Sequence, residues 1–419
     1  MKRMKKRLLL KKIMIILAIV TLLGAWFISY KEKTKKTNEN INDDKQYAEV
    51  LKQAYPQAEE FQKISPEPLT FSARDSNQKE IGFVAFGEAN GYGGPLKIAV
   101  GIDLNGQIIS TIIAEQSETP SYIAEIIQKG YLDKFKTAKV TSPFVLGVDL
   151  NGISGATISS KAIAKAIRNA SHTVGKTDLN LEVKEINEPW NFGAAEAAVM
   201  LVFICAIIFS FFTKQLNLLF KRKLNLRLPI ILCSMIVLGF WLNRPISMQY
   251  LTGAMLGFFP SIRENFLWYL ILFTGIGLPL FTGKNIYCFW VCPFGGLQEI
   301  INKLCGVKYR LKIAKIFKVT RYFLLWLGIF LVIINNNTAS GNIEPFGTVF
   351  GFKGTGFYWI ELITVLVIGI FSYKFWCYFL CPIGAVMDLL CNVNHVVTKK
   401  LLQVYRRLIY KKSHETSAS

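Results

Sequence analysis

The chain has 419 residues, of which 52% are hydrophobic, and its mean hydropathy is +0.33. This composition is too apolar for an ordinary soluble protein, and the charges in its first half exclude a wholly membrane-embedded one. The formal net charge of +21 is compatible with nucleic-acid binding, but the distribution of the charges along the chain argues against that function.

Six apolar segments are candidate membrane spans. Most of them have 16–21 residues, about the length that a bilayer core requires, and the fifth is the shortest. They lie at 10–30, 194–212, 228–243, 266–283, 321–335 and 357–373. No small-x-small cleavage site follows the first one, so we expect residues 1–30 to be an uncleaved membrane anchor.

The loops between these spans alternate between basic and nearly uncharged. Residues 1–12 hold seven Lys/Arg and 374–419 hold seven, whereas the loops 244–265 and 336–356 hold two and one. Cytoplasmic segments carry the excess of basic residues, so we expect both termini in the cytoplasm. The near-neutral segment 31–193, with 19 Lys/Arg and 21 Asp/Glu, then faces outward. The prediction is a multi-pass cell-membrane protein that contacts lipid and not nucleic acid.

The outward segment 31–193 predicts a small α+β domain without cysteine. Runs of β-branched and aromatic residues predict strands at 81–86, 96–102 and 107–113, and Asn105-Gly106 predicts a hairpin between the last two. A helix is expected at 121–129. Another begins near Thr157, because apolar residues recur there at helical spacing, with Ser154 or Thr157 as its N-cap.

The residues around Thr157 carry a family resemblance. Ser154-Gly155-Ala156-Thr157 resembles the flavinylation motif of the FMN-binding domain found in subunits of Rnf and of the Na⁺-pumping quinone reductase, and in NosR-type regulators. Gly91-Tyr92-Gly93-Gly94-Pro95 and Glu118-Thr119-Pro120 are also similar to that domain. The resemblance implies FMN joined to Thr157 by a phosphoester that a flavin transferase makes, with Ser154, Gly155, Ala156, Glu118 and Thr119 at the site.

The membrane half contains one cysteine motif twice. Cys288-Phe-Trp-Val-Cys292-Pro293-Phe-Gly295 and Cys377-Tyr-Phe-Leu-Cys381-Pro382-Ile-Gly384 each follow an apolar span, and we expect proline to end or bend the helix there. The charge pattern places both copies at the cytoplasmic face, where four thiolates could bind an iron–sulfur cluster.

Other ligands stay open at this stage. Cys305 and Cys391 follow the two pairs and could substitute for one of the four cysteines, and a tetrahedral zinc site is the alternative to a cluster. Glu344 lies in an outward loop, where we expect a solvated side chain, the alternative being a buried carboxylate that handles quinol protons. About 30 Å of hydrocarbon would then separate the cysteine centre from the flavin, with no ligand set for a carrier between them.

The fold class that follows is an α-helical polytopic membrane protein of about six spans with an extracytoplasmic α+β FMN-binding domain. The expected domains are the anchor 1–30, the FMN domain 31–193, a five-span domain 194–398 and a basic tail 399–419. This order resembles the NosR/NirI-type membrane flavoproteins. Within that family the chain is most similar to the RdhC/PceC/CprC-type flavoproteins associated with reductive dehalogenases.

The resemblance implies an electron-transfer component rather than an enzyme with its own small-molecule substrate. Electrons would come from menaquinol or from the cytoplasmic iron–sulfur centre, reach FMN outside, and pass to an exported reductase, for example a reductive dehalogenase. A redox sensor, transcriptional regulator or maturation factor of the NosR/NirI type is the alternative.

Overall fold

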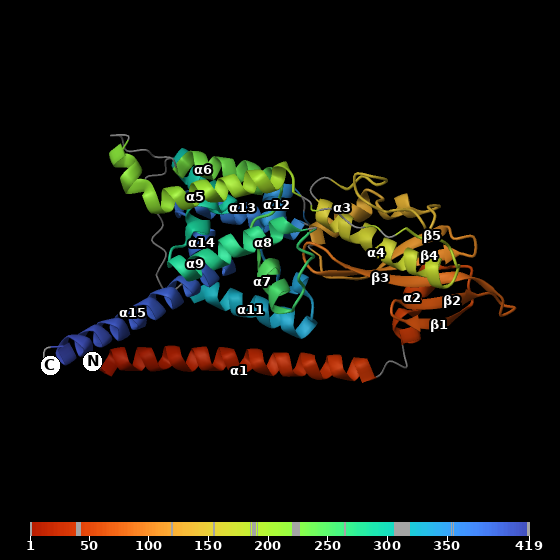
Figure 1. The fold of residues 1–419 in the computed structure, drawn as a ribbon, viewed down its shortest axis with the longest axis horizontal. Coiled ribbons are helices and arrows are strands. Elements are labelled where there is room, and N and C mark those ends of the chain that lie inside the picture. Colours follow the sequence, from red (N-terminus) through yellow and green to blue (C-terminus); the bar gives the residue numbers. More distant parts are fainter. Residues whose placement is uncertain are drawn as a thin grey trace.

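The computed structural model describes the chain except residues 1, 39–42, 119, 154–155, 185, 187–189, 191, 220–226, 264, 306–318, 353, 355 and 417–419. The molecule has a helical half and a half built on one β-sheet, which lie end to end (Figure 1). Both termini lie at the end of the helical half that is remote from the sheet.

The sheet is a five-stranded antiparallel meander in which the strand order follows the chain. Three of its strands overlap the predicted ones, and the Asn105-Gly106 hairpin joins the last two, with Gly106 at φ +75°. The first two strands are not among the three predicted ones. The strands are β1 (Glu60–Pro66), β2 (Leu69–Arg74), β3 (Glu80–Asn90), β4 (Pro95–Asp103) and β5 (Ile108–Gln116).

Helices cover both faces of this sheet. Helix α4 (Thr157–Thr177) lies on one face, so close to β3 that a β-carbon at Gly87 would stand 1.9 Å from the Ala166 carbonyl oxygen. Helix α2 (Asp43–Ala54) packs on the other face. Helix α3 (Pro120–Gln128) matches the predicted helix, and the short η1 (Leu132–Phe135) follows it. Because strands alternate their side chains, the two faces form separate apolar cores.

The helical half is a bundle of long and short helices, several of which contain π-helical turns. Its members are α1 (Lys2–Asn38), α5 (Ala194–Leu219), α6 (Arg227–Ser234), η2 (Met235–Trp241), α7 (Met248–Met255), α8 (Phe266–Leu272), η3 (Phe273–Gly277), α9 (Leu278–Thr282), η4 (Tyr287–Val291), α10 (Pro293–Cys305), α11 (Thr320–Asn335), η6 (Thr338–Gly341), α12 (Phe346–Gly351), α13 (Gly356–Phe371), α14 (Phe375–Phe379) and α15 (Pro382–Thr416).

Each predicted apolar span coincides with helical structure, but the lengths differ. Within the described residues, Ile13–Lys31 and Ala194–Thr213 are long and apolar enough to cross a membrane. The other four are shorter apolar helices, at Arg227–Trp241, Phe266–Thr282, Thr320–Asn335 and Gly356–Phe371. Six spans and their orientation therefore stay predictions.

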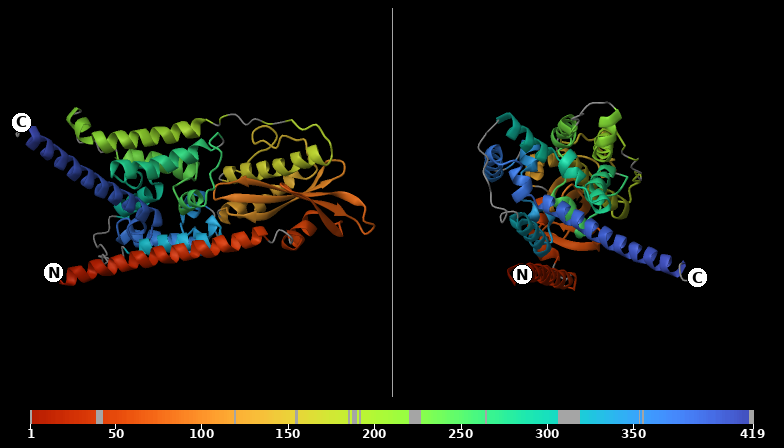
Figure 2. Two further views of the ribbon diagram at one scale, coloured as in Figure 1. Left: turned by 60° about the horizontal axis from the view of Figure 1, so that its bottom comes forward. Right: turned by 90° about the vertical axis from the view of Figure 1, so that its left-hand side faces the viewer.

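The N-terminal helix is longer and more peripheral than the sequence indicates. It continues to Asn38, past the expected anchor boundary at residue 30, and it runs along the outside of the bundle beside α11 (Figure 2). The Trp326 indole N–H donates to the Thr21 hydroxyl at 3.2 Å. Most apolar side chains of its span are exposed, as expected of a helix in contact with lipid.

Candidate functional site

The four cysteines of the two repeated motifs line one cavity of about 600 Å³. Cys288 comes from η4 and Cys292 follows directly after it. Cys377 comes from α14, and Cys381 stands just before α15. Neither Cys305 nor Cys391 lines this cavity, so the structure favours the four motif cysteines over these two substitutes.

The two motifs also share one backbone conformation. In each copy the amide of the second cysteine donates to a carbonyl five residues earlier, Cys292 to Tyr287 at 2.7 Å and Cys381 to Trp376 at 2.8 Å. In each copy the glycine amide three residues later donates to the cysteine sulfur. The Gly295 N–H lies 3.4 Å from the Cys292 Sγ, and the Gly384 N–H lies 3.3 Å from the Cys381 Sγ.

This conformation places the second cysteine of each motif at a helix N-terminus. The preceding helices η4 and α14 end before the proline, as expected, and Pro293 and Pro382 are the first residues of the next helices, α10 and α15. Free N–H groups and the helix dipole favour a negatively charged thiolate at that position. Hydrogen bonds to ligand sulfurs also tune the reduction potential of an iron–sulfur cluster.

Contacts between the motifs bring the two halves of the repeat together. The buried Gln298 of α10 donates from Nε2 to the Cys377 Sγ at 3.7 Å and accepts the Trp376 N–H at 3.0 Å. A β-carbon at Gly295 would stand 3.5 Å from the Cys377 Sγ and 3.6 Å from the Cys292 Sγ. A larger residue at this glycine would therefore intrude between sulfurs of different motifs.

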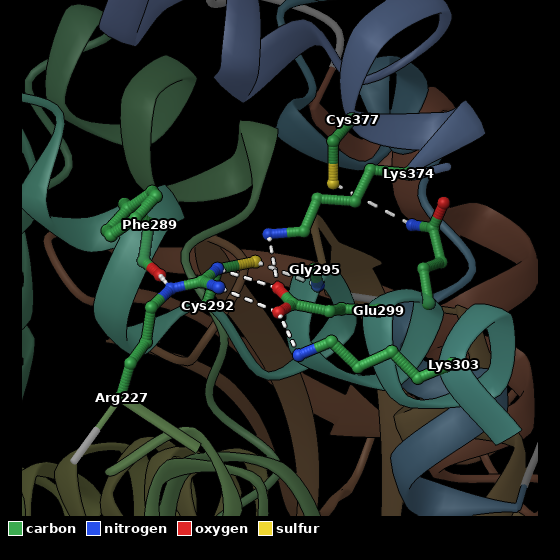
Figure 3. Close-up of polar contacts among 9 residues, drawn as sticks. Arg227, Phe289, Cys292, Gly295, Glu299, Lys303, Lys374 and Cys377 are labelled. Atoms are coloured by element: carbon green, nitrogen blue, oxygen red, sulfur yellow. Dashed lines mark hydrogen bonds and ion pairs between the residues drawn. The ribbon is translucent and has the colours of Figure 1, made fainter. Parts of the chain in front are cut away.

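A buried carboxylate next to the cavity gathers three basic side chains (Figure 3). Glu299 of α10 accepts two hydrogen bonds from Arg227, at 2.7 and 2.6 Å, and pairs with Lys303 at 2.8 Å and Lys374 at 3.1 Å. Its side chain is 3% exposed. Arg227 precedes the third apolar span and Lys374 follows the sixth, so Glu299 fastens α10 to both of them.

The size of the cavity is compatible with a metal cluster. A tetrahedral zinc ion bonds each sulfur at about 2.3 Å and would need all four sulfurs within about 4 Å of one another. Among the described residues, no three histidine, cysteine, aspartate or glutamate side chains converge as one metal ion would require. The four cysteines instead surround a larger cavity, which fits a multi-iron cluster.

Thr157 lines a second cavity, of about 390 Å³. It is the first residue of α4, and its hydroxyl donates to the Ile153 carbonyl at 3.3 Å. Ala156 takes the N-cap position, so the expected capping by Thr157 is wrong, while Ser154, Gly155 and Thr119 lie outside the described residues. A volume of this size is in the range of small-molecule sites.

Glu118 lies behind this cavity rather than in its lining. Its side chain is fully buried, and Oε2 accepts the hydroxyl of Ser159, two residues after Thr157 on α4. A β-carbon at Gly91 would stand 1.7 Å from the Glu118 Oε1, so only glycine fits there. Glu118 therefore holds the start of α4 against the glycine-rich loop, and it reaches the Thr157 pocket through Ser159, which lines that pocket.

The rest of the glycine-rich loop docks on the helical half. The Thr338 hydroxyl of η6 is hydrogen-bonded to the Gly93 carbonyl and donates to the Ser117 carbonyl at 3.0 Å. A β-carbon at Gly94 would come within 2.9 Å of the Thr338 Oγ1. These glycines thus allow the backbones of the two halves to approach closely.

One buried segment, Asn243–Ser247, connects the two cavities. Arg244 lines the Thr157 pocket and Ile246 lines the cysteine cavity, and two residues of backbone extend about 7 Å at most. The Tyr122 hydroxyl donates to the Asn243 carbonyl at 3.2 Å. The chain between the third span and α7 therefore passes from the lining of one site to the lining of the other. The expected separation of about 30 Å between the two centres stays a prediction.

A small polar cavity of about 20 Å³ lies between the two sites, and Glu344 lines it. Tyr92 and Tyr122 line both this cavity and the Thr157 pocket, and Phe346 lines both this cavity and the cysteine cavity. Glu344 is 4% exposed, so the expectation of a solvated loop carboxylate is wrong. One oxygen accepts the Met248 N–H at 2.8 Å, and the other has no hydrogen-bond partner among the described residues.

Comparison with known protein families assigns a cofactor to each site. Residues 91–172 match the FMN-binding domain, and residues 264–312 and 359–399 match a 4Fe-4S binding domain. The first match includes Thr157, and the two segments of the second include all four motif cysteines. FMN and an iron–sulfur cluster are therefore the cofactors, as the sequence predicts.

Several characterised proteins are similar to parts of the chain. The chain is 29% identical to Protein NirI of Paracoccus denitrificans over 214 residues, 46% of the chain and 30% of NirI. It is 33% identical to the Regulatory protein NosR of Stutzerimonas stutzeri over 150 residues, 31% of the chain and 21% of NosR. A component of the proton-translocating ferredoxin:NAD(+) oxidoreductase complex of Clostridium ljungdahlii is 29% identical, over 28% of the chain and 65% of that component.

The chain thus spans about a third or less of the length of the NirI and NosR proteins. The comparisons confirm the expected resemblance to that type. The similarity to the dehalogenase-associated subgroup stays a prediction.

Sequence reasoning missed several residues of both sites. Gln298 and Glu299 follow the first cysteine motif, and both are buried in the structure. The sequence signal that could have revealed them is a glutamate within a basic segment. Asn243 and Arg244 stand at the end of an apolar span with no recognisable motif. Only the packing of the two halves brings them to the flavin pocket.

Replacement of one cavity cysteine should remove most of the iron and acid-labile sulfide from the purified protein. Cys377→Ser takes away one of four thiolates that surround the cavity, whereas Cys391→Ser alters a cysteine of similar chain position that does not line it. Cys233→Ser, on an exposed part of α6, is the second control. Iron loss in Cys391→Ser but not in Cys377→Ser would contradict this ligand set.

The buried Glu344 should make stability depend on pH in a defined direction. Burial raises the pKa of this carboxyl from 4.5 to about 8, so the folded protein keeps its proton over a pH range in which the unfolded chain loses it. Stability from this group therefore falls as pH rises from about 4.5 to about 8. Glu344→Gln removes the effect, so the variant should gain thermal stability relative to the wild type at pH 8 compared with pH 5.

The matched control is Glu49→Gln, at an exposed position of α2. The difference in thermal stability between Glu49→Gln and the wild type should change less between the two pH values than the corresponding difference for Glu344→Gln. An equal difference for Glu344→Gln at both pH values would show that the carboxyl ionises normally.

Proposed function

We propose that this chain, a flavoprotein of the NosR/NirI type, carries electrons at a membrane between two bound cofactors. An iron–sulfur cluster would be held by Cys288, Cys292, Cys377 and Cys381, and FMN would be joined through a phosphoester to Thr157. Both groups supply one-electron chemistry when bound.

The contact between the two sites is the observation that carries this proposal. The segment Asn243–Ser247 contributes residues to both cavities, and Tyr92, Tyr122 and Phe346 fill the space between them. Electron transfer through protein needs cofactors that are close together with packed atoms between them. In this arrangement, the shared segment and these aromatic side chains would form the route between the two groups.

Backbone amides and basic side chains of the protein make each site suitable for its cofactor. The α4 N-terminus at Thr157 offers free N–H groups to a phosphate. At the other site, the Gly295 and Gly384 amides donate to cysteine sulfurs, and Lys374 and Arg321 line the cavity as counter-charges for a thiolate-bound cluster.

The wider electron route extends the proposal to partners. The names of two other relatives point to electron transport, a putative electron transport protein YccM of Escherichia coli and a ferredoxin-type protein NapH of Haemophilus influenzae. We propose menaquinol or a cytoplasmic donor at one end and an exported reductase, such as a reductive dehalogenase, at the other. The membrane orientation remains the one predicted from the charges, with the FMN domain outside and both termini inside.

A second candidate is a redox sensor or maturation factor that controls a partner enzyme. The observation that favours it is that the NosR relatives are named regulatory proteins. The two candidates differ in the rate at which a partner oxidises the flavin, because a carrier must keep pace with enzyme turnover and a sensor need not.

The covalent bond at Thr157 can be tested on a denaturing gel. The wild-type band should show flavin fluorescence in ultraviolet light, and Thr157→Ala should lose it because the attachment oxygen is gone. Thr177→Ala, at the exposed far end of the same helix, should keep it. A fluorescent Thr157→Ala band would place the attachment at another residue.

Electron exchange between the sites can be measured without a partner. Electrons delivered in substoichiometric amount by a light-triggered reductant should distribute between the flavin and cluster absorbance bands. The distribution should follow a rate that is independent of protein concentration, because the two groups belong to one chain. Cys377→Ser and Thr157→Ala should each abolish this phase. A rate proportional to protein concentration would mean that the two sites in one molecule do not exchange electrons.

A further inference from the structure

The lining of the flavin pocket includes residues outside the FMN-binding domain. The match to the FMN-binding domain ends at residue 172, whereas the pocket around Thr157 is also lined by residues 193–196 and 241–244. About half of the lining therefore comes from the helical half, at the start of α5 and at the end of η2. Nothing in the family match assigns a role to these residues.

The loop after η2 brings a cation to this pocket. Asn243 has a left-handed backbone, with φ +49°, which turns the chain at the end of the third apolar span. Arg244 follows, half-buried, and its amide donates to the Leu238 carbonyl at 2.8 Å. Among the residues that the structure describes, no hydrogen-bond or ion-pair partner engages the Arg244 guanidinium, although this residue lines the pocket.

No polar group of the described lining forms an ion pair or hydrogen bond with this guanidinium. Glu196 lines the same pocket, but its Oε2 accepts the Gly193 N–H at 2.8 Å, as a cap of α5. Glu118 lies behind the lining and accepts from Ser159. Asn243 is 4% exposed, and neither atom of its amide group has a hydrogen-bond partner in the described part of the chain. A buried amide without a partner and a guanidinium without a direct ion pair, both in the lining of one cavity, indicate a polar, anionic ligand.

The position of Thr157 determines which part of FMN lies near Arg244. A phosphoester on Thr157 sits at the first turn of α4, where helix N–H groups bind the phosphate. The ring system must then occupy the remaining pocket, toward the wall formed by Trp241–Arg244. The Trp241 side chain is 54% exposed and offers a face for stacking.

We infer that Arg244, from the helical half, is a positioning residue for the flavin ring and stabilises its reduced, anionic form. The inference rests on the proposed attachment of FMN at Thr157. Reduction of the ring by two electrons and one proton leaves one negative charge on it. A guanidinium beside that charge favours the reduced state, and charge near the ring is one of the means by which proteins tune flavins. The helical half would thus set the potential of a cofactor that the other half binds.

The test measures the flavin midpoint potential of the purified, flavin-loaded protein by spectroscopic redox titration. At a fixed applied potential, Arg244→Gln should lower the ratio of reduced to oxidised flavin by at least about tenfold, or about 30 mV for a two-electron couple. Arg244→Lys keeps the charge and should restore most of the ratio. Arg263→Gln, which removes an exposed cation from the loop between α7 and α8, should leave it unchanged.

A second measurement covers the case in which Arg244→Gln fails to fold. Trp241→Leu should raise the fluorescence of the attached flavin in the native protein, because a stacked indole quenches it, and Trp359→Leu on α13 should not. An unchanged potential in Arg244→Gln, or unchanged fluorescence in Trp241→Leu, would overturn the inference. Absence of flavin from the wild-type band on a denaturing gel would instead overturn the attachment at Thr157.

Discussion

A short stretch of irregular, largely buried backbone, Asn243–Ser247, determines the arrangement of both sites. The Asn243 and Arg244 amides pair with carbonyls of η2, but other backbone groups of the segment have no helix or strand partner, and an unpaired buried backbone group costs about 1–3 kcal/mol. Tyrosine hydroxyls satisfy them instead: Tyr122 donates to the Asn243 carbonyl and Tyr92 to the Pro245 carbonyl, while Tyr287 accepts the Ile246 N–H. Two of these tyrosines belong to the FMN domain and the third stands beside Cys288. The same hydrogen bonds therefore fix the position of the flavin pocket and of the cysteine cavity.

Positively charged side chains next to the cysteine cavity can offset the negative charge of thiolates there. Glu299 is one buried carboxylate with three basic partners, which leaves an excess of positive charge next to the cavity. Lys374 belongs to this group and also lines the cavity. A buried carboxylate contributes little stability by itself. Its role here is to keep Arg227, Lys303 and Lys374 together from three parts of the chain.

The sequence predicts those parts of the molecule that depend on local pattern. The repeated spacing of Cys288, Cys292, Cys377 and Cys381 indicates one shared centre, and periodicity places a helix start at Thr157. The burial of Glu344 could not be predicted, because Pro345 and Gly347 beside it are typical of a solvated loop and only docking of the other half covers it. The link between the two sites through one segment was missed for a related reason. Charge counting assigns each loop to a membrane face, but it does not show how deeply residues 243–247 enter the bundle.

The internal repeat has a consequence for biosynthesis. Each copy of the motif presents two thiols, its own proline-initiated helix and its own amide-to-sulfur hydrogen bond. Four thiols meet only after the third apolar span, α10 and the C-terminal helices have packed around Glu299 and Gln298. In the proposed site, iron delivery must therefore follow translation of nearly the entire chain. Metal incorporation would then act as a quality-control step that separates completed polypeptides from truncated ones.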